Sequence, residues 1–479
     1  MVFNYVVFKT KDRHYLYDGV SSNFFEINED LFFNHEYIFG CITNGTKPLN
    51  LYTNSYNDIL NTIESGNLSP SHAGKAEFWF DIEQYKVDLQ NDICHLMIGI
   101  TEKCNMRCKY CIYSGHYANE RKHGNKHIQS GLLLKSIDEF FKISKSDSKI
   151  VNFYGGEPFL SFETIQHAVE YINAKDNSVR IYITTNGTLL DRHVRRWFFE
   201  NKNVNLFISI AGYPSLHDEL RNFENNTKSF NIIKSKLLCM KHESGFDYME
   251  RVHFIFNLFS EAQLIESQHF FQTDEMFDRY EKIPEITFID CADGDEIIKD
   301  LSRDINTRHK SDINPLAEYI MLLKNNDTNN IIVKHFDNKY MNIHRRTNFK
   351  DNILCGVCRP FIKKMFIDVD GNINICENFV SQCGFGNIRD GFSYNSITEL
   401  LKTYSLARNK TCAKCWASKV CSLCFRDLID KDGTVNEARA KYLCDSEKCA
   451  IRAALAEYCE ILEHGESLLD HLDDYTLHV

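Results

Sequence analysis

Three cysteines lie close together in the segment from Thr101 to Tyr113, TEKCNMRCKYCIY. Cys104, Cys108 and Cys111 place three thiols within eight residues, and thiolates are soft ligands that suit iron–sulfur clusters and zinc. A [4Fe-4S] cube takes four ligands, so this loop would leave one iron for another molecule. A catalytic metal site keeps such an open position, whereas a structural site fills every one. The alternative is a zinc loop or three unrelated buried thiols, although zinc loops favour paired C-x2-C units.

The spacing C-x3-C-x2-C, with Tyr110 directly before the last cysteine, resembles the signature of the radical S-adenosylmethionine (SAM) superfamily. The resemblance implies that the open iron binds the amino and carboxylate groups of SAM. One electron passed to the sulfonium would release methionine and a 5′-deoxyadenosyl radical, which takes a hydrogen atom from the substrate. Cys104, Cys108 and Cys111 would therefore hold the catalytic cluster.

The elements that must position this loop alternate between strand-like and helix-like stretches. Apolar runs predict strands at 94–100, 149–154, 179–184, 204–210, 251–257 and 285–290, and amphipathic stretches predict helices at 130–143, 161–173, 189–200 and 228–243. Alternating β and α units form parallel sheets with right-handed crossovers, so we predict an α/β fold with a partial (β/α)6 barrel over residues 92–300. Active sites in such sheets lie beyond the carboxyl ends of the strands, and the cysteine loop follows the first strand.

Loops after the next three strands resemble the SAM-binding motifs of the same superfamily. The sequence GGEP follows the second strand, TNG the third, and the fourth ends in ISI, although each motif alone could be an ordinary turn or helix cap. The two glycines of GGEP would let the backbone approach a ligand closely, and the resemblance implies that this motif meets the methionyl amino group. The SAM contacts implied are Tyr110, Gly155, Gly156, Glu157, Pro158, Asn186 and Ser209.

The fourth strand continues into AGYPSLHDELR, where relatives usually have S-x-D-G followed by H-D and R. Ser209, His217, Asp218 and Arg221 match this pattern, but Ala211 stands in place of the acidic residue. We therefore expect Ser209 to be the ribose contact and expect no acid–base role at position 211.

A second group of cysteines lies in the last third of the chain. Two of them precede FIKKMFIDVDGNINICEN, in which Asp370-Gly371 predicts a hairpin turn between two strands, and TCAKCWASKVCSLC follows. The pattern resembles the SPASM extension of radical SAM enzymes, except that two residues rather than three separate Cys421 from Cys424. The resemblance implies two auxiliary [4Fe-4S] clusters, the first held by Cys355, Cys358, Cys376 and Cys424, the second by Cys412, Cys415, Cys421 and Cys444.

One or two structural zinc sites are the competing interpretation of this second group, because thiolates bind both metals. With the cysteine loop near residue 104, the SPASM interpretation gives three [4Fe-4S] clusters in all. The remaining cysteines are expected to be small buried hydrophobes, with Cys383 close enough to Cys376 to replace it as a ligand.

The N-terminal segment has a different pattern. Short aromatic and β-branched runs at 2–8, 14–17 and 23–27 predict a three-stranded meander, followed by a helix at 56–65. This order resembles the winged-helix-like recognition element of enzymes that mature ribosomally synthesised and post-translationally modified peptides (RiPPs). In that family a leader peptide adds a strand to the sheet edge. We assign residues 1–85 to such a leader-binding domain; a structural extension is the alternative.

The rest of the chain completes the predicted domain order. Residues 301–350 are expected to form a polar bridge with one helix at 315–324, residues 351–450 the SPASM domain, and residues 451–479 a C-terminal helix. The loop after the first cysteines carries Tyr113, Tyr117, Arg121 and His123, which resemble a pattern of maturases that crosslink cysteine-bearing peptides, or form a solvated polar loop.

Composition narrows the class of protein. The 479 residues carry a net charge of −11 with no strongly basic run, which argues against nucleic acid or an anionic membrane as a partner. No stretch approaches about eighteen consecutive apolar residues, and charge appears too early for a secretory signal. Eighteen cysteines are too sparse for a disulfide scaffold, and their grouping suits metal binding in a reducing compartment, so we expect a cytoplasmic protein.

Together these resemblances favour a radical SAM peptide maturase of the sactipeptide or ranthipeptide kind, which joins a cysteine sulfur to a carbon as a thioether. Its partners would be a precursor peptide and a reductant such as flavodoxin or ferredoxin. Alternatives are another SPASM reaction, namely carbon–carbon crosslinking, epimerisation or anaerobic sulfatase maturation. A non-catalytic iron–sulfur or zinc protein that binds peptides is the alternative outside enzymes.

Overall fold

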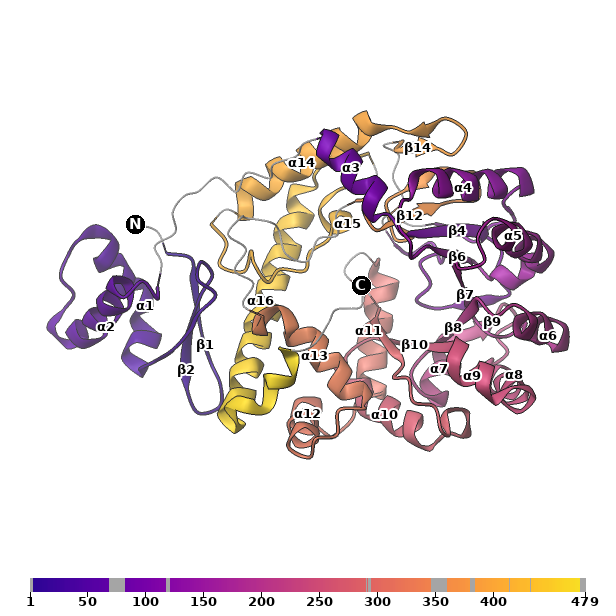
Figure 1. Ribbon diagram of the computed structural model, residues 1–479. Coiled ribbons are helices and arrows are strands. Elements are labelled where there is room, and N and C mark those ends of the chain that lie inside the picture. Colours follow the sequence, from indigo (N-terminus) through magenta and orange to yellow (C-terminus); the bar gives the residue numbers. More distant parts are fainter. Residues whose placement is uncertain are drawn as a thin grey trace.

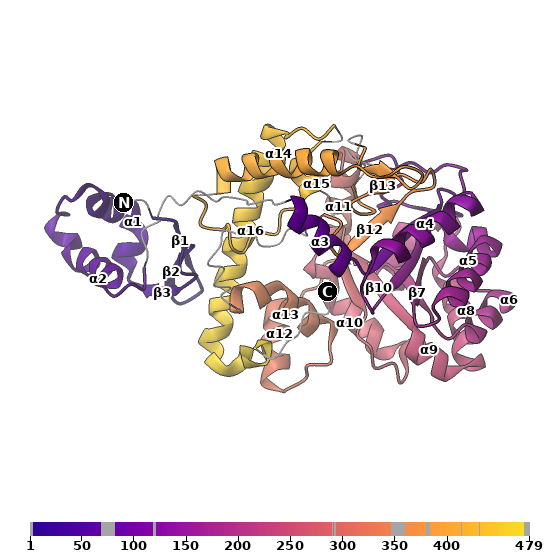
Figure 2. The ribbon, with the colours of Figure 1, turned by 45° about the horizontal axis from the view of Figure 1, so that its top comes forward.

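The computed structural model describes residues 3–68, 82–117, 121–289, 291, 294–345, 360–379, 384–412, 414–430 and 432–473. No helix within these ranges has both the length and the apolar character needed to cross a lipid bilayer. A small N-terminal lobe lies at one end of the molecule and the large sheet with its helices at the other (Figure 1). The long helix α16 (Glu437–His464) stands between them (Figures 1 and 2).

Six parallel strands form the centre of the large body. In sheet order, which is also chain order, they are β4 (His95–Thr101), β6 (Ile150–Gly155), β7 (Arg180–Thr185), β8 (Val204–Ile210), β10 (Val252–Leu258) and β11 (Glu285–Phe288). Neighbouring strands pair in parallel throughout. The predicted α/β fold with a parallel sheet is therefore confirmed, and each strand boundary lies within two residues of its predicted position.

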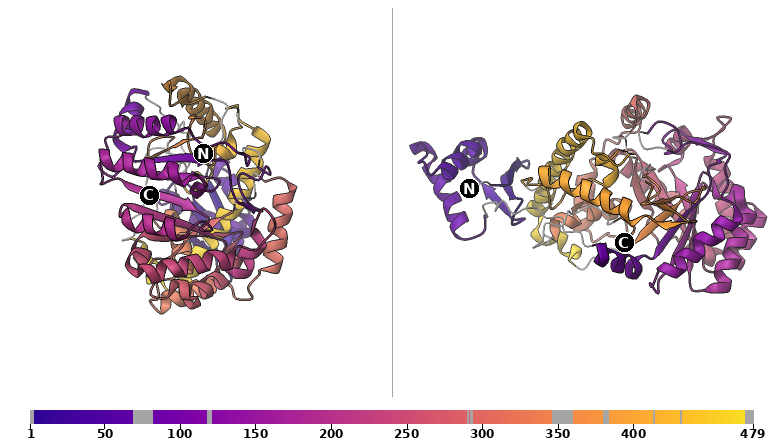
Figure 3. Two further views of the ribbon diagram at one scale, coloured as in Figure 1. Left: turned by 90° about the vertical axis from the view of Figure 1, so that its right-hand side faces the viewer. Right: turned by 90° about the horizontal axis from the view of Figure 1, so that it is seen from above.

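Helices connect these strands and lie along one side of the sheet (Figure 3). They are α4 (Ser130–Ile143), α5 (Phe162–Lys175), α6 (Arg192–Glu200), α7 (Pro214–Leu220), α8 (Phe230–Glu243), α9 (Gly245–Arg251) and α10 (Leu264–Thr273). Helix α4 shows why they form, because its apolar residues recur at helical spacing and four of them, Leu132, Leu133, Ile137 and Phe140, are buried. All four helices predicted in this region are present.

The predicted hairpin around Asp370-Gly371 is also present, as β12 (Lys364–Ile367) and β13 (Ile373–Asn374), and Gly371 adopts a φ of +84° at the turn. The sequence did not indicate where this hairpin goes. Strand β12 pairs in parallel with β4, so the hairpin extends the central sheet to eight strands. Because β13 runs antiparallel to β12, the residues that follow β13 return toward the amino end of β4, and Glu377 stands near His95 there.

The N-terminal lobe contains the predicted meander, with the antiparallel strands β1 (Tyr5–Lys9), β2 (His14–Asp18) and β3 (Phe24–Ile27). Helices α1 (Glu29–Asn44) and α2 (Thr53–Glu64) cover one face of this sheet. A separate apolar cluster holds them there and includes Leu16, Leu31, Ile38, Ile42 and Ile59. The winged-helix assignment of this lobe stays a prediction.

The other face of the small sheet packs against α16. The ring of Phe24 stacks on Tyr458 with centroids 5.6 Å apart, and the hydroxyls of Thr10 and Tyr15 both donate to Glu463 at 2.7 and 2.9 Å. Helix α3 (Ile82–Asp92), by contrast, lies across the large body (Figure 1), where the Tyr85 hydroxyl donates to the carbonyl of Pro360. The predicted domain boundary at residue 85 therefore falls inside a helix that belongs with the large body.

The bridging region is more helical than the sequence suggested, which corrects the expectation of one helix. It contains α11 (Glu296–Arg308), α12 (Pro315–Lys324) and α13 (Ile331–His344). The side chains of Asp295, Asn314 and Asn330 cap their first turns. The polar, Asn-rich residues that suggested loops thus supply the helix caps.

The C-terminal part adds β14 (Gly386–Asn387), β15 (Gly391–Phe392), α14 (Tyr394–Cys412) and α15 (Phe425–Leu428). Helix α16 begins earlier than expected.

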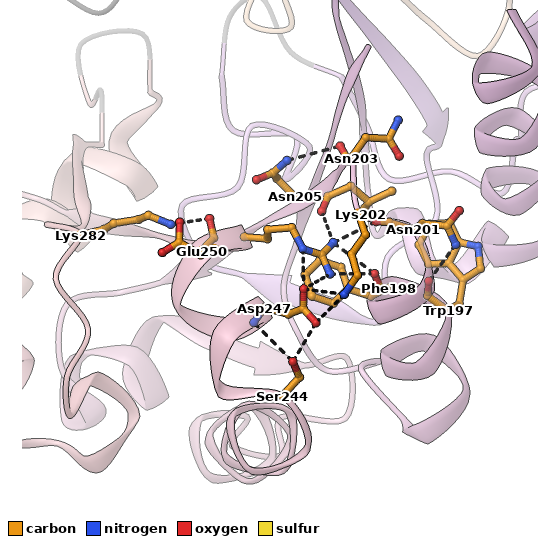
Figure 4. Close-up of polar contacts among 12 residues, drawn as sticks. Trp197, Phe198, Asn201, Lys202, Asn203, Asn205, Ser244, Asp247, Glu250 and Lys282 are labelled. Carbon is orange, nitrogen blue, oxygen red and sulfur yellow. Dashed lines mark hydrogen bonds and ion pairs between the residues drawn. The ribbon is translucent and has the colours of Figure 1, made fainter. Parts of the chain in front are cut away.

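A buried ion pair fastens the amino ends of two central strands. Arg251 donates to Asp247 at 2.8 Å and to the carbonyls of Phe198, at the end of α6, and Val204, at the start of β8. Asp247 also accepts from Lys202 and Ser244, as Figure 4 shows. Burial alone would raise the pKa of Asp247, but these hydrogen bonds hold it below its usual value. The network gives the sheet a fixed base opposite the cysteine loop.

Candidate active site

A cavity of about 710 Å³ lies against the central sheet, and we call it the central cavity. Side chains from all six parallel strands line it, and so do Cys104, Cys108 and Cys111. These cysteines follow the carboxyl end of β4, which is the edge at which parallel sheets bind ligands. The structure thus brings the three predicted cluster ligands to the wall of a single cavity.

Local hydrogen bonds fix the cysteine loop. Its short strand β5 (Met106–Cys108) pairs antiparallel with β9 (Arg221–Phe223), and the backbone N–H of Lys109 donates to the carbonyl of Leu220. Arg107 donates to the carbonyl of Cys104 at 2.8 Å. Backbone N–H groups also point at sulfur, from Met106 to Cys104 and from Tyr113 to Cys111, each at 3.4 Å. Such donors stabilise thiolates, which is the form that binds metals.

The environment of these thiols opposes their ionisation unless a metal replaces the proton. Burial, with Glu157 nearby, raises the pKa of Cys104 to about 12. Burial, with Cys108 nearby, raises the pKa of Cys111 to about 12. Metal binding to such a site releases protons and therefore depends on pH.

The arrangement of donors fits a [4Fe-4S] cluster better than a single ion. Within the described ranges, no three His, Cys, Asp or Glu side chains converge as ligands of one metal ion. A tetrahedral zinc needs its ligands about 2.0–2.3 Å from one centre. An iron–sulfur cube instead gives each thiolate its own iron, so three thiols can stand apart around a shared cavity, as these do.

A buried cation lies beside the thiols. The Arg221 guanidinium is only 5% exposed, donates to the Tyr110 hydroxyl at 2.8 Å, and has no partner for its Nε among the described residues. Burial tends to lower the pKa of Arg221, but Cys108 and Tyr110 outweigh it and raise the pKa. Both side chains line the central cavity. Arg221, which the sequence motif matched without a role, therefore places a permanent positive charge where anionic cluster thiolates would sit.

The other residues of that motif act on the backbone rather than on the cavity. The ring of His217 accepts from the N–H of Ala211 at 3.3 Å and meets Ser229, whose hydroxyl donates to the carbonyl of Arg221. Burial, with Arg221 nearby, holds the pKa of His217 well below its usual value, so the imidazole is neutral. Asp218 accepts from the N–H of Phe230. These contacts hold the Arg221 backbone in place, and Ala211 is buried outside the cavity wall.

The two glycines of GGEP line the central cavity, as expected, and the structure gives a further reason for them. A Cβ on Gly155, whose φ is +134°, would stand 2.3 Å from the carbonyl oxygen of Thr101. A Cβ on Gly156 would stand 2.2 Å from the carbonyl of Lys103. Only glycine lets this turn pass directly beneath the cysteine loop.

Glu157 is fully buried, and neither it nor Pro158 is among the residues that line the central cavity. Its carboxylate accepts from the Thr185 hydroxyl at 2.7 Å, the N–H of Asn186 at 2.8 Å and the N–H of Phe159 at 3.1 Å. Burial raises its pKa, and these donors counteract the rise. The side chain ties the second loop to the third; its direct contact with SAM stays a prediction.

Asn186 and Ser209 both face the central cavity. Asn186 donates to the side chain of Asn105 at 2.9 Å and lies 4.0 Å from the sulfur of Cys104. Tyr110, Gly155 and Gly156 line the same space. Five of the seven predicted SAM contacts therefore share one cavity with the three cysteines.

Sequence reasoning missed several residues on the opposite wall. Glu377 and Asn378 reach the cavity from the segment after β13, and Glu377 is held by Lys364 at 2.8 Å. Tyr154 faces the same region, and burial, with Glu377 nearby, raises its pKa well above the usual value. The one available signal was that Glu377 directly follows Cys376.

Aromatic rings close the other end of the cavity. His95 lies against Tyr182 with centroids 6.5 Å apart, Tyr182 against Phe207 at 5.1 Å, and Phe207 stacks on His253 at 4.8 Å. Burial lowers the pKa of both histidines to about 4. This neutral layer separates the cysteine end of the cavity from the amino ends of the strands.

The polar loop after the cysteines also contributes to the cavity. Tyr113, Tyr117 and Arg121 line it, the Tyr117 hydroxyl donates to the carbonyl of Tyr110, and the Arg121 guanidinium lies 4.0 Å from the ring of Phe366. His123 lies outside it, with its ring 5.9 Å from that of Tyr113. The interpretation of this loop as a wholly solvated segment is therefore wrong for Tyr113, Tyr117 and Arg121, which line the cavity.

The second cysteine group is described only in part, because Cys355, Cys358 and Cys383 lie outside the described residues. Arg408 is 2% exposed and donates toward the sulfur of Cys421 at 3.9 Å. Burial tends to lower the pKa of Arg408, while Tyr404, Cys412 and Cys421 raise it. Burial, with Cys412 nearby, raises the pKa of Cys444, and Cys415 adds to the rise. These four thiols are the set predicted for the second auxiliary cluster.

Cys376 lies near Cys424, which is not one of the four thiols of the second predicted set. Burial raises its pKa to about 11, Glu377 adds to the rise, and Cys424 contributes further. Cys376 and Cys424 are the two described members of the set predicted for the first auxiliary cluster. The metal that either set binds stays a prediction.

Comparison with known proteins gives matches concentrated on the central sheet. Residues 98–236 match the model of the Radical SAM superfamily. An uncharacterized protein of Methanocaldococcus jannaschii is 32% identical over 138 residues, which is 28% of this chain and 44% of that protein. The radical SAM cyclopropyl synthase TigE of Paramaledivibacter caminithermalis is 24% identical over 197 residues, 37% of this chain and 41% of that protein. The chain thus spans less than half the length of these curated relatives.

One solved structure shares the fold more widely. Native anSMEcpe with bound AdoMet and Cp18Cys peptide superposes with a TM-score of 0.52 and 19% identity, over 80% of this chain and 99% of that one. Residues 98–236 therefore match a Radical SAM domain, and such a domain implies a [4Fe-4S] cluster and SAM.

Proposed function

We propose that this protein is a radical SAM enzyme that installs thioether crosslinks, from a cysteine sulfur to a carbon, in a ribosomally synthesised precursor peptide. The observation that carries the proposal is the central cavity, whose wall holds Cys104, Cys108 and Cys111 at one side and Glu377 at the other. Ligand cavities commonly measure about 300–1,000 Å³. A cavity of about 710 Å³ can hold SAM together with a short segment of peptide.

When bound, the cluster and SAM would supply a 5′-deoxyadenosyl radical that takes a hydrogen atom from the peptide. The residues of the chain bind and position the reactants. Arg221 gives positive charge beside the cluster thiolates, and Gly155 and Gly156 bring bare backbone to the cavity. Glu377, held by Lys364, offers a carboxylate that can take the proton of the substrate thiol. The aromatic layer at the far end keeps water from the reacting groups.

The supporting parts of the proposal concern the rest of the chain. We infer that Cys355, Cys358, Cys376 and Cys424 hold one auxiliary [4Fe-4S] cluster and that Cys412, Cys415, Cys421 and Cys444 hold another, which would accept the surplus electron. The N-terminal lobe would bind the leader, because β3 has one edge with no strand partner among the described residues. A leader held there raises the effective concentration of the core peptide. We place the enzyme in the cytoplasm, where its thiols stay reduced.

The test is anaerobic incubation of iron-loaded protein with SAM, dithionite and a cysteine-bearing candidate precursor, followed by mass spectrometry. Each thioether removes two hydrogen atoms from the peptide and makes the cysteine resistant to alkylation. The same peptide with its cysteine changed to alanine is the control and should remain unmodified. A product that lost two hydrogens but still alkylates would indicate a carbon–carbon crosslink, and an unchanged mass with inverted stereochemistry would indicate epimerisation.

A second candidate function rests on the fold shared with anSMEcpe, whose structure holds AdoMet and the Cp18Cys peptide. Maturation of an anaerobic sulfatase oxidises a single residue and forms no crosslink. Presenting a cysteine-bearing sulfatase peptide without a leader separates the two functions. Turnover of that peptide at the rate of a leader-bearing precursor would favour the sulfatase function.

A further inference from the structure

A second hollow, of about 560 Å³, lies on the outer side of the cysteine loop, and we call it the outer hollow. It is lined by Arg107, Cys108, Lys109, Tyr113, Ser114, His116, Lys122, His123, Ile297 and Leu301. Cys108 and Tyr113 line the central cavity as well. The cysteine loop is therefore the wall between the two spaces, and Cys108 faces both.

The outer hollow has a fixed frame. The N–H of Asp295, just before α11, donates to the carbonyl of His116, and the His116 ring meets the Asp295 carboxylate at 2.9 Å. On the opposite side, Arg107 is bound to the Cys104 carbonyl at 2.8 Å and to Glu224 at 2.6 Å. These contacts join the cysteine loop to α11 on one side of the hollow and to Glu224 on the other.

The charge of the outer hollow is opposite to that of the whole molecule. Three of its lining residues, Arg107, Lys109 and Lys122, are cationic and none is acidic. Residues 101–127 carry six lysines and arginines against two glutamates, in a chain whose net charge is −11. Nearby Glu224 and Asp295 are paired with Arg107 and His116, and Glu219 stands near Lys109, so the excess of positive charge at the hollow is smaller than its lining alone indicates. A local basic surface on an acidic protein attracts an acidic partner and directs it to that surface.

An apolar contact stands at the edge of the same hollow. Ile297 on α11 is 57% exposed, and Leu301 lies one turn further along the helix. A small apolar centre inside a polar rim is the usual arrangement of a protein interface. Transient redox encounters bury little surface, below about 1,200 Å², so such an encounter needs only a small docking area.

We propose that the outer hollow is the docking surface of an acidic one-electron carrier protein of the flavodoxin class. The inference rests on the proposed function, because a cluster bound at Cys108 would need one electron from outside the protein. On docking, the reduced carrier loses one electron and the enzyme gains it, with no atom transferred. Cys108 is the predicted cluster ligand that reaches this surface, so the electron enters without passing through the substrate space.

The experiment reverses two charges of the outer hollow, in the variant Lys109→Glu/Lys122→Glu. Both lysines are exposed, and neither lies in the central cavity. The control, Lys142→Glu/Lys402→Glu, makes the same change of net charge on α4 and α14, where the lysine side chains are 74% and 60% exposed. Binding of oxidised acidic flavodoxin is measured by titration at low and high salt, and enzyme reduction by the flavodoxin hydroquinone is measured separately from reduction by dithionite.

We expect the hollow variant to bind flavodoxin about tenfold more weakly and to be reduced by it more slowly, with a smaller dependence on salt. Reduction by dithionite should be unchanged, and the control variant should match the wild type. Equal flavodoxin binding by both variants would overturn the proposal, as would a loss of dithionite reduction equal to the loss with flavodoxin. Because binding is measured without SAM or peptide, failure of the proposed function would leave this result intact.

Discussion

Two carboxylates, Glu285 and Glu377, are among the described residues that line the central cavity, and they belong to different parts of it. Glu377 stands near Tyr154, whose other neighbours include Tyr113 and Cys111, and it also stands near His95, so it lies between the cysteine loop and the aromatic layer. Glu285 begins β11 and pairs with Ile255 in the middle of β10, on the far side of the sheet from β4. Of these two carboxylates, only Glu377 is near Tyr154, and we infer that it takes the proton of the substrate thiol.

We therefore predict that Glu377→Gln separates SAM cleavage from crosslinking. Formation of 5′-deoxyadenosine should stay within about twofold of the wild type, while crosslinked peptide should fall by at least about 100-fold, the usual contribution of an acid–base group. Both products are measured in one chromatographic run. Glu285→Gln is the control in the same cavity and should retain crosslinking. If product and 5′-deoxyadenosine fall together, Glu377 acts on SAM binding instead.

The cysteines could be predicted from the sequence, and Glu377 could not, for a physical reason. Cys104, Cys108 and Cys111 are recognisable because a cluster needs its ligands at a short, regular spacing in one loop. Glu377 enters the site through the parallel pairing of β12 with β4, two strands far apart in the sequence. Such long-range pairing leaves no local pattern, so the same limit applies to Tyr154 and its neighbours.

At the scale of elements, the parallel strands and their helices follow from the apolar periodicity of the sequence, because alternate strand residues are buried while those between them face the central cavity. Helix α11 was missed because it buries only Ile298 and Ile305 and depends on its capping side chain, and α13 was missed because polar residues interrupt its apolar ones in the sequence. Helix α13 buries Ile331, Phe336 and Tyr340 against the rest of the body. Tertiary packing, rather than local composition, therefore determines that these segments are helical.

The Asp247 network gives a prediction on the stability of the central elements. Asp247→Asn removes the partner of buried Arg251, which typically costs about 3–5 kcal/mol of unfolding free energy. Because the folded-state pKa of Asp247 is lowered, its contribution is present above the unfolded pKa of the group and is lost as the pH falls through the folded pKa. Chemical denaturation should therefore show a large difference from the wild type at pH 7 that shrinks well below pH 4. Asp300→Asn, in an exposed pair with Arg303, should change stability by less than about 1 kcal/mol; an equal loss in both variants would contradict the account.

Strand β3 offers a test of leader binding. Asp18 donates its N–H to the carbonyl of Asn23, and hydrogen-bonded pairs alternate along antiparallel strands, so the N–H of Glu26 points to the open edge. Glu26→Pro removes that donor without breaking the β2 ladder. We expect it to weaken binding of a fluorescent leader peptide at least about tenfold. Glu26→Ala, which removes only the exposed ion pair with Arg13, should bind like the wild type; equal binding by all three proteins would exclude leader addition at this edge.

For the whole molecule, the metal content distinguishes the two interpretations of the cysteine-rich C-terminal part. Three cubes predict about twelve irons per chain, whereas zinc in the second group predicts about four irons. Cys412→Ala, in the second predicted set, should remove about four irons and leave SAM cleavage by the first cluster measurable. Elemental analysis of anaerobically prepared protein gives the count. Wild-type protein that contains about four irons, with zinc in the second cysteine group, would disprove the auxiliary clusters.

The central claim is that Cys104, Cys108 and Cys111 hold an iron–sulfur cluster that cleaves SAM. The most direct measurement is the amount of 5′-deoxyadenosine that anaerobic, iron-loaded protein forms from SAM and dithionite. We predict formation by the wild type and none by Cys108→Ala, while Cys239→Ala, at an exposed cysteine outside the predicted sets, keeps the activity. A wild type that forms none, or a Cys108→Ala variant that forms as much, would contradict the account.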